Sequence, residues 1–174
     1  MFRLNAKGKT MQGANVTTDR TNALAELGKM FNFEYSSDDV DKLAPVVILF
    51  KTGAKRVKYR TDVSALGSTV KSELYTTPTT SANGTEIVPV NYNPTIGAPA
   101  PLIKIYHTPT VSNNGTLVYT RHFLGWSQGA TSVGISKSGA IWRWLPANST
   151  FLAVLTPAAD DTQVTYGGDF SEEE

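Results

Sequence analysis

Residues 77–85 read TPTTSANGT and residues 108–116 read TPTVSNNGT, so one nine-residue motif occurs twice with seven identical positions. An apolar segment that ends in a tyrosine, Tyr75 or Tyr106, precedes each copy. This pattern predicts two equivalent strand and turn units, 31 residues apart, which form a rim rich in Thr, Ser and Asn at one end of the fold. The alternative is two unrelated turns that share the same turn chemistry.

Turn residues mark where the strands around each motif end. Proline fixes φ and has no amide hydrogen for a sheet, and Asn-Gly pairs supply the positive φ of a tight turn. If Gly84 and Gly115 take positive φ, replacing either with Val should cost about 1 kcal/mol or more, whereas replacement with Asn should be mild. The residues expected to form structural turns are Pro78, Asn83, Gly84, Pro109, Asn114, Gly115 and Pro146.

Strand periodicity extends in both directions from the repeat. In residues 56–60, Val57 and Tyr59 alternate with three cations, as in a strand with one buried face. Residues 46–50 read VVILF, which predicts a strand covered on both faces, inside a sandwich or under an arm. The expected strands are Phe31–Tyr35, Val46–Thr52, Arg56–Asp62, Thr69–Tyr75, Glu86–Val90, Leu102–His107, Leu117–Phe123, Ala140–Trp144, Phe151–Leu155 and Gln163–Tyr166.

Composition supports an all-β fold. The 174 residues fit one domain, and the chain holds 22 Thr and 13 Ser but has only 18% charged residues. Short strands, Gly, Pro and Asn turns, and the absence of a long amphipathic pattern predict an antiparallel β-sandwich, jelly-roll-like, with about 8–10 strands. We expect an extended N-terminal arm over 1–35, the sandwich over 36–170 and an acidic tail over 171–174.

The arm is the first candidate for an interface. Residues 1–60 carry 11 Lys and Arg against 6 Asp and Glu, and the first part of the chain is polar and rich in Gly, with one helical hint at 21–30. Such a segment gains order by lying on an acidic or polar surface. A chain that begins at Asn32 is therefore expected to keep the sandwich. The arm residues expected at an interface are Phe2, Arg3, Leu4, Lys7, Lys9, Met11 and Arg20.

A proline-rich crossover between the two motifs is the second candidate. Residues 90–101 contain three prolines and neither Lys nor Glu, which indicates an extended segment that lies against protein. A Gly-rich connection near residue 126 carries a tryptophan that we expect to be partly exposed. The interface residues expected here are Tyr92, Pro94, Pro99, Pro101 and Trp126.

Several classes of function are not indicated. The chain has no cysteine, no apolar run typical of a signal peptide and no segment long enough to cross a membrane, so we expect a soluble protein made in the cytosol. The formal net charge is +1, and no stripe of Lys and Arg is interleaved with aromatic residues. We expect neither nucleic acid nor membrane as a partner.

The residues that could support catalysis or metal binding are few. His107 and His122, with Glu86 or Asp62, lack a metal-binding spacing, and residues 38–41 lack the pattern of a calcium loop. We therefore expect no enzymatic activity, no metal and no cofactor.

Two tryptophans in the closing hairpin admit two interpretations. Trp142 and Trp144 lie on one face of a strand, with Arg143 on the other. We favour a buried core position for both tryptophans over a sugar-binding platform.

Residues 72–85, 91–93, 105–111 and 114–117, and the closing hairpin at 145–152, resemble a group of small virion proteins of tailed bacteriophages. The resemblance covers roughly residues 46–155. It implies a head decoration, cement or minor structural protein with a β-sandwich fold and no enzymatic activity.

The expected function is therefore that of a structural virion protein that binds the outside of a capsid and stabilises it. Its expected partners are the major capsid protein and copies of itself, with a trimer favoured, and its expected location is the capsid surface. The alternatives are a carbohydrate-binding or structural module of a phage tail or fibre and a cupin-like enzyme, which shares the jelly-roll architecture.

Overall fold

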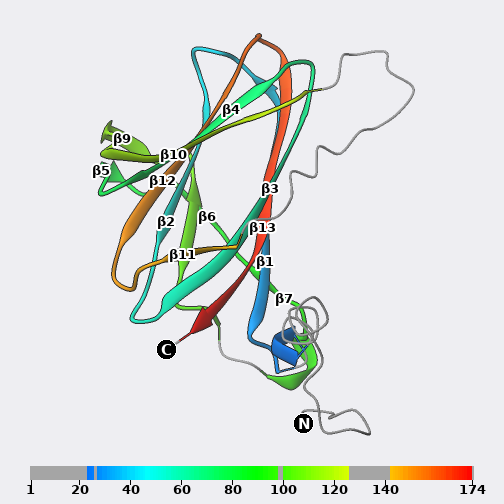
Figure 1. The fold of residues 1–174 in the computed structure, drawn as a ribbon, viewed down its shortest axis with the longest axis vertical. Coiled ribbons are helices and arrows are strands. Elements are labelled where there is room, and N and C mark those ends of the chain that lie inside the picture. Colours follow the sequence, from blue (N-terminus) through cyan, green and yellow to red (C-terminus); the bar gives the residue numbers. More distant parts are fainter. Residues whose placement is uncertain (1–22, 26, 98–99, 126–141, 174) are drawn as a thin grey trace, which may run out of the picture.

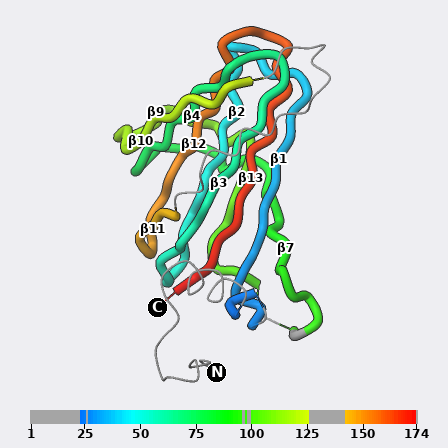
Figure 2. Tube along the Cα trace, turned by 45° about the vertical axis from the view of Figure 1, so that its right-hand side comes forward, coloured from blue at the N-terminus to red at the C-terminus, as the bar shows by residue number. Residues whose placement is uncertain are grey.

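The computed structural model describes residues 23–25, 27–97, 100–125 and 142–173. Two antiparallel sheets pack against each other, which confirms the all-β sandwich, and a two-stranded ribbon projects from one side (Figure 1). The five-stranded sheet has the order β11-β3-β13-β1-β7, the six-stranded sheet has the order β10-β4-β12-β2-β8-β6, and the ribbon is β5-β9. Figure 2 shows the long strands β3, β13 and β1 side by side.

The elements have the following bounds: β1 Met30–Val40, β2 Val46–Lys51, β3 Arg56–Leu66, β4 Val70–Thr76, β5 Thr79–Ala82, β6 Thr85–Ile87, β7 Val90–Asn91, the 3-10 helix η1 Pro94–Ile96, β8 Lys104–His107, β9 Thr110–Asn113, β10 Thr116–Phe123, β11 Arg143–Leu145, β12 Thr150–Pro157 and β13 Thr162–Glu173.

Alternating apolar residues form the core between the two sheets. Val57 and Tyr59 of β3 are buried, whereas the cations beside them are exposed or half-buried, as predicted. Aromatic rings meet at the centre, where Phe33 of β1 packs edge-on against Phe50 of β2 with ring centroids 5.6 Å apart. The inward face of each strand is therefore set by its period-two pattern.

The two repeated motifs pair with each other. The first unit consists of β4, β5 and β6, and the second of β8, β9 and β10. The middle strands, β5 and β9, pair with each other and form the ribbon. The last strand of each unit pairs with the first strand of the other, β6 with β8 and β10 with β4. The Asn-Gly pairs therefore do not close simple two-residue hairpins. Neither β5 nor β9 was among the predicted strands, because a Thr-rich segment beside proline has the same pattern as a loop.

An approximate two-fold axis relates the two units. The amide of Thr77 donates to the carbonyl of Thr150, and the equivalent amide of Thr108 donates to the carbonyl of Val47, both over 3.1 Å. Leu49 and Leu152 are partners in register and are also equivalent under this relation, which places the axis at that pair.

A second, smaller core lies at this axis. Leu49, Leu152 and Val154 are buried on the face of the six-stranded sheet that the ribbon covers, and Val111 of β9 packs on them. The apolar run 46–50 is therefore covered on both faces, as predicted, by the main core on one side and by the ribbon on the other.

The motif glycines are restricted by space as well as by φ. Gly84 and Gly115 both have φ of 88°. A Cβ at Gly84 would lie 2.1 Å from the carbonyl oxygen of His107, and one at Gly115 would lie 2.2 Å from that of Thr76. The expectation that Asn would be mild at these positions is wrong, because any side chain collides with backbone of the other unit.

The expected segment boundaries need correction at both ends. Met30 and Phe31 are buried in β1, so the sheet begins five residues before the expected end of the arm, and a chain that starts at Asn32 lacks part of the core. The acidic end is also structural, because β13 continues to Glu173 and pairs with β3. Ser171 is buried, and Glu172 accepts a hydrogen bond from the amide of Ile103 over 2.7 Å.

Proline divides one expected strand. Residues 86–90 belong to β6 of one sheet and β7 of the other, with Pro89 between them. Because proline cannot donate to a sheet, the chain leaves the first ladder there and crosses to the second sheet. The expected strand at 140–144 is observed as Arg143–Leu145, and its first two residues lie outside the described chain.

Candidate functional site

The outer face of the five-stranded sheet carries rows of polar side chains in strict register. One row joins Asn32, Asp169 and Arg60, and the next joins Glu34, Gly167 and Asp62 across β1, β13 and β3. A third row consists of Ser36, Thr165 and Ser64. Neighbouring strands lie about 4.8 Å apart, so these groups form a regular lattice of hydrogen-bonding atoms. We call this surface, with its margins on β7 and β11, the outer face.

Asp169 is the anchor of the first row. It is buried, pairs with the guanidinium of Arg60 and accepts hydrogen bonds from Asn32 Nδ2 over 3.2 Å and from the Tyr92 hydroxyl over 2.5 Å. Desolvation and the hydrogen bond to Asp169 raise the pKa of Tyr92 to about 12. The carboxylate is thereby satisfied by side chains from β1, β3 and the residue that follows β7, and it ties the crossover to the sheet.

A shallow trough lies beside Asp169. Its volume is about 200 Å³, and Gly167 leaves it open because no side chain projects there. Glu34 and Asp62 stand on either side of this glycine in the same row. Carboxylate, amide and hydroxyl groups line the trough, so it can hydrogen-bond a polar ligand.

Two tryptophans flank the lattice on the β11 side. Trp144 is 45% exposed, with the guanidinium of Arg56 4.3 Å from its ring centroid. Trp142 is half-buried, with Lys58 Nζ 5.2 Å from its ring centroid. The expectation that these rings belong to the core is wrong: β11 pairs with β3 so that Trp144 stands beside the outward Lys58, and Arg143 faces inward.

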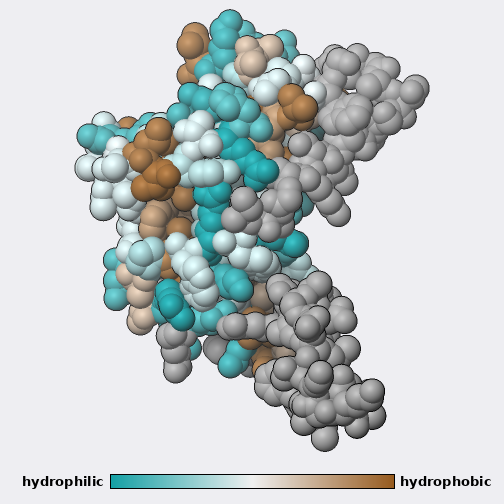
Figure 3. All heavy atoms as spheres, in the orientation of Figure 1, coloured by the Kyte–Doolittle hydropathy of each residue, from teal (hydrophilic) through white to brown (hydrophobic). Residues whose placement is uncertain are grey.

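Apolar and aromatic side chains mark the opposite margin. Val90 of β7 and Tyr92 after it have exposed fractions of 66% and 52%. β7 pairs with β1 so that Val90 continues the row of Asn32. On the side of the molecule seen in Figure 3, hydrophobic residues likewise form separate patches between hydrophilic areas. The outer face therefore has a polar centre and apolar margins.

The structure brings only part of the predicted interface to this face. Tyr92 lies on it, Pro94 follows as an exposed residue of η1, and Pro101 is half-buried. The polar rows were not predicted, although the Gly167-Gly168 pair inside a strand indicates a surface that lacks side chains or is closely approached by another backbone. The other predicted interface residues lie outside the described chain: Phe2, Arg3, Leu4, Lys7, Lys9, Met11, Arg20, Pro99 and Trp126.

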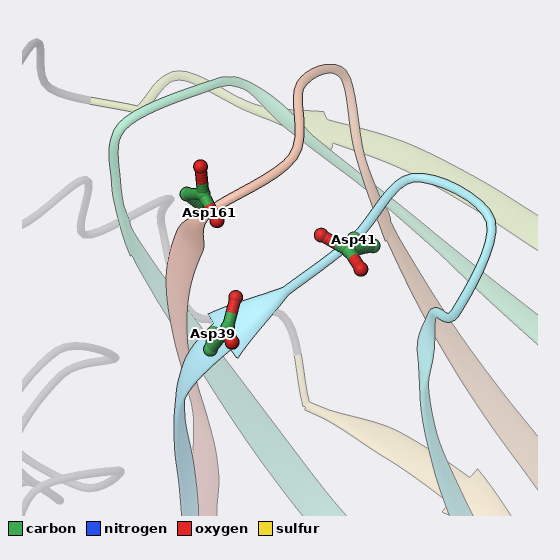
Figure 4. Close-up of side chains that lie close together, drawn as sticks. All are labelled: Asp39, Asp41 and Asp161. Carbon is green, nitrogen blue, oxygen red and sulfur yellow. The ribbon is translucent and has the colours of Figure 1, made fainter.

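A cluster of carboxylates stands at the end of the sandwich. Asp39 at the end of β1, Asp41 in the loop after it and Asp161 in the turn before β13 have oxygens within 4.8 Å of one another (Figure 4). All three side chains are exposed, and the neighbouring Asp160 pairs with Lys42. Exposed acidic turns are common without an ion, so this cluster alone does not identify a metal site.

The two histidines lie apart from such a cluster. His107 is half-buried and stacks on Tyr35 with ring centroids 4.6 Å apart, whereas His122 is exposed on β10. Within the described residues, neither belongs to a group of three side chains placed to hold an ion.

No family model, curated protein or solved structure matches this chain. Within the described residues, no helix is long and apolar enough to span a bilayer.

Proposed function

We propose that the protein is a structural virion protein that binds the outside of a tailed-phage capsid and stabilises it, with the outer face as a contact surface. The observation that carries this proposal is the composition of that face. Exposed Val90 and Tyr92 at one margin and Trp144 at the other enclose paired and hydrogen-bonded polar groups. Stable protein interfaces use aromatic anchors of this kind, with polar groups that are already satisfied.

The motifs that resemble decoration proteins support the proposal through their structural role. Residues 74–85 and 105–116 form the interlocked units. Leu145 of β11 and Leu155 of β12 are buried, although the predicted closing hairpin does not form, because β11 pairs with β3 and β12 pairs with β2 and β4. The arm supplies a second contact in this proposal, with the major capsid protein as the partner. Self-association, for which we favour a trimer, is tested separately by light scattering on the purified protein.

Capsids that lack the native protein provide the test. We expect Trp144→Ala and Val90→Asp to weaken binding in a sedimentation assay, and a chain that begins at Ala23 to bind more weakly and with less salt dependence. Val118→Ala is the matched control, because Val118 is 53% exposed on β10 of the other sheet. Wild-type affinity of both outer-face variants would exclude this face as the attachment surface.

The trough and Trp144 also favour a second candidate function, a carbohydrate-binding module of a tail or fibre. An exposed indole on the same face of the sheet as carboxylate and amide groups suits a sugar ring, which offers both apolar and polar surface. Several hundred copies in the virion support the capsid role, whereas a dozen or fewer, together with glycan binding that Trp144→Ala removes, support the tail role.

A further inference from the structure

A small pocket between the two sheets holds two arginines. Its cavity of about 20 Å³ lies where β10 and β11 flank the sandwich, away from the outer face. Arg121 of β10 and Arg143 of β11 line it, one from each sheet, beside the residues Tyr59, Thr61, Ser72 and Tyr166. The pocket therefore combines two cations with hydroxyl groups at the edge of the core.

Aromatic rings hold both guanidinium groups. Arg143 lies 3.3 Å from the ring centroid of Tyr119, and Arg121 lies 5.3 Å from that of Phe123. A ring covers the flat face of a guanidinium and leaves the N–H groups at its edge available to an acceptor. These contacts fix the positions of the two charges without neutralising them.

No described carboxylate pairs with either arginine, whereas Arg60 on the outer face pairs with Asp169. The tyrosines of the pocket do not serve as anions, because burial raises the pKa of Tyr59 to about 12 and also raises that of Tyr166. The connection from residue 126 to 141, which joins β10 to β11, contains no Asp or Glu. Partly buried cations without an anion are unfavourable.

We propose that Arg121 and Arg143 form a binding pocket for a single carboxylate group, carried by a small organic acid or by an acidic side chain of a partner protein. The two guanidinium groups supply charged donors, and the hydroxyls of Ser72 and Tyr59 supply neutral ones. The cavity, of about 20 Å³, has room for no more than one small group. This site is independent of the proposed function and lies on a different part of the molecule.

The test follows the side-chain Nε–H signals of the arginines by NMR. Sodium acetate replaces sodium chloride at constant pH and ionic strength, and a blocked glutamate, N-acetylglutamate methylamide, is titrated in parallel. We expect saturable shifts of Arg121 and Arg143, with little change at Arg56, which also stacks on an aromatic ring but lies on the outer face. Arg143→Gln should weaken acetate binding about tenfold, and Arg56→Gln should leave it unchanged.

The outcomes distinguish a free acid from a partner side chain, and specific binding from a general effect on all arginines. Stronger binding of acetate identifies a free acid as the ligand, and stronger binding of the blocked glutamate identifies a partner side chain; either supports the pocket. Equal, non-saturable shifts at all arginines, or tighter binding of phosphate than of either acid, would overturn the proposal. If Arg143→Gln does not fold, Arg121→Gln provides the same comparison from the other sheet, and unchanged affinity there also overturns it.

Discussion

Gly84 and Gly115 are equivalent positions of the repeat, and each packs against the end of the strand that belongs to the other unit. A Cβ on Gly84 would meet the backbone at His107, and one on Gly115 would meet the backbone at Thr76. The two units are therefore locked together by two reciprocal close approaches. This relationship gives the first prediction.

Gly84→Ala and Gly84→Asn should both destabilise the protein strongly, by about 3 kcal/mol or more, because the ladder between β6 and β8 must shift to admit a side chain. Gly97→Ala is the control, since Gly97 also has positive φ, 60°, but a Cβ added there would lie more than 4 Å from every residue that the structure describes other than its neighbours in the chain. It should cost only about 1 kcal/mol. Urea denaturation measures the free energy of unfolding of each variant. Equal losses of stability at Gly84 and Gly97 would show that the close approach of backbone at Gly84 is not the cause.

The second prediction concerns the start of the sandwich. Phe31 is buried and stacks on Phe170 with ring centroids 5.3 Å apart. Phe31→Ala in the full chain should lower the free energy of unfolding by about 3–5 kcal/mol. A chain that begins at Ala23 should unfold at the same urea concentration as the full chain, and one that begins at Asn32 should be much less stable. Equal stability of all three would contradict the assignment of β1.

The third prediction concerns the small core at the two-fold axis. Leu152 is fully buried there, so Leu152→Ala should cost about 2–5 kcal/mol. Val111→Thr should cost about 1 kcal/mol or less, because the equivalent residue of the other unit, Thr80, already occupies a half-buried position in the ribbon. Thermal unfolding measures the stability of both variants against the wild type. A mild effect of Leu152→Ala would show that the ribbon does not seal a second core.

The fourth prediction concerns alkaline pH. The folded protein holds the Tyr92 proton to about pH 12, whereas an unperturbed tyrosine loses it near pH 10.0. The unfolded chain therefore binds fewer protons between these values, and the folded state loses stability as the pH rises through this window. Tyr92→Phe should show a shallower decline of stability from pH 10 to 12 than the wild type. The pKa of Tyr59 is also raised to about 12, and this residue is present in both proteins. Part of the decline in stability therefore remains in Tyr92→Phe.

Urea midpoints at pH 8, 10 and 11 measure this difference. The difference in stability between wild type and Tyr92→Phe at pH 8 measures the loss of the hydrogen bond to Asp169. Any further change in that difference at pH 10 and 11 measures the titration of Tyr92. Parallel declines in the two proteins would show that Tyr92 does not take part in the pH dependence.

The sequence by itself determined the class of fold and the inward face of its regular strands. Alternation in residues 56–60 places Val57 and Tyr59 in the core whatever their partners are, because side chains point to opposite faces at every step. Prolines and the motif glycines likewise marked where strands end, since their backbone constraints are local. The repeat itself was evident from the identical residues of 77–85 and 108–116.

Only the tertiary structure decided which strands meet. The two motifs exchange strands because each third strand finds a complementary edge in the other unit, and no local signal encodes that choice. The same reason explains Trp142 and Trp144: alternation put them on one face, but the register of β11 with β3 turned that face outward. The polar rows and the arginine pocket also arise from pairings between segments distant in the chain, so their residues carry no common pattern in the sequence.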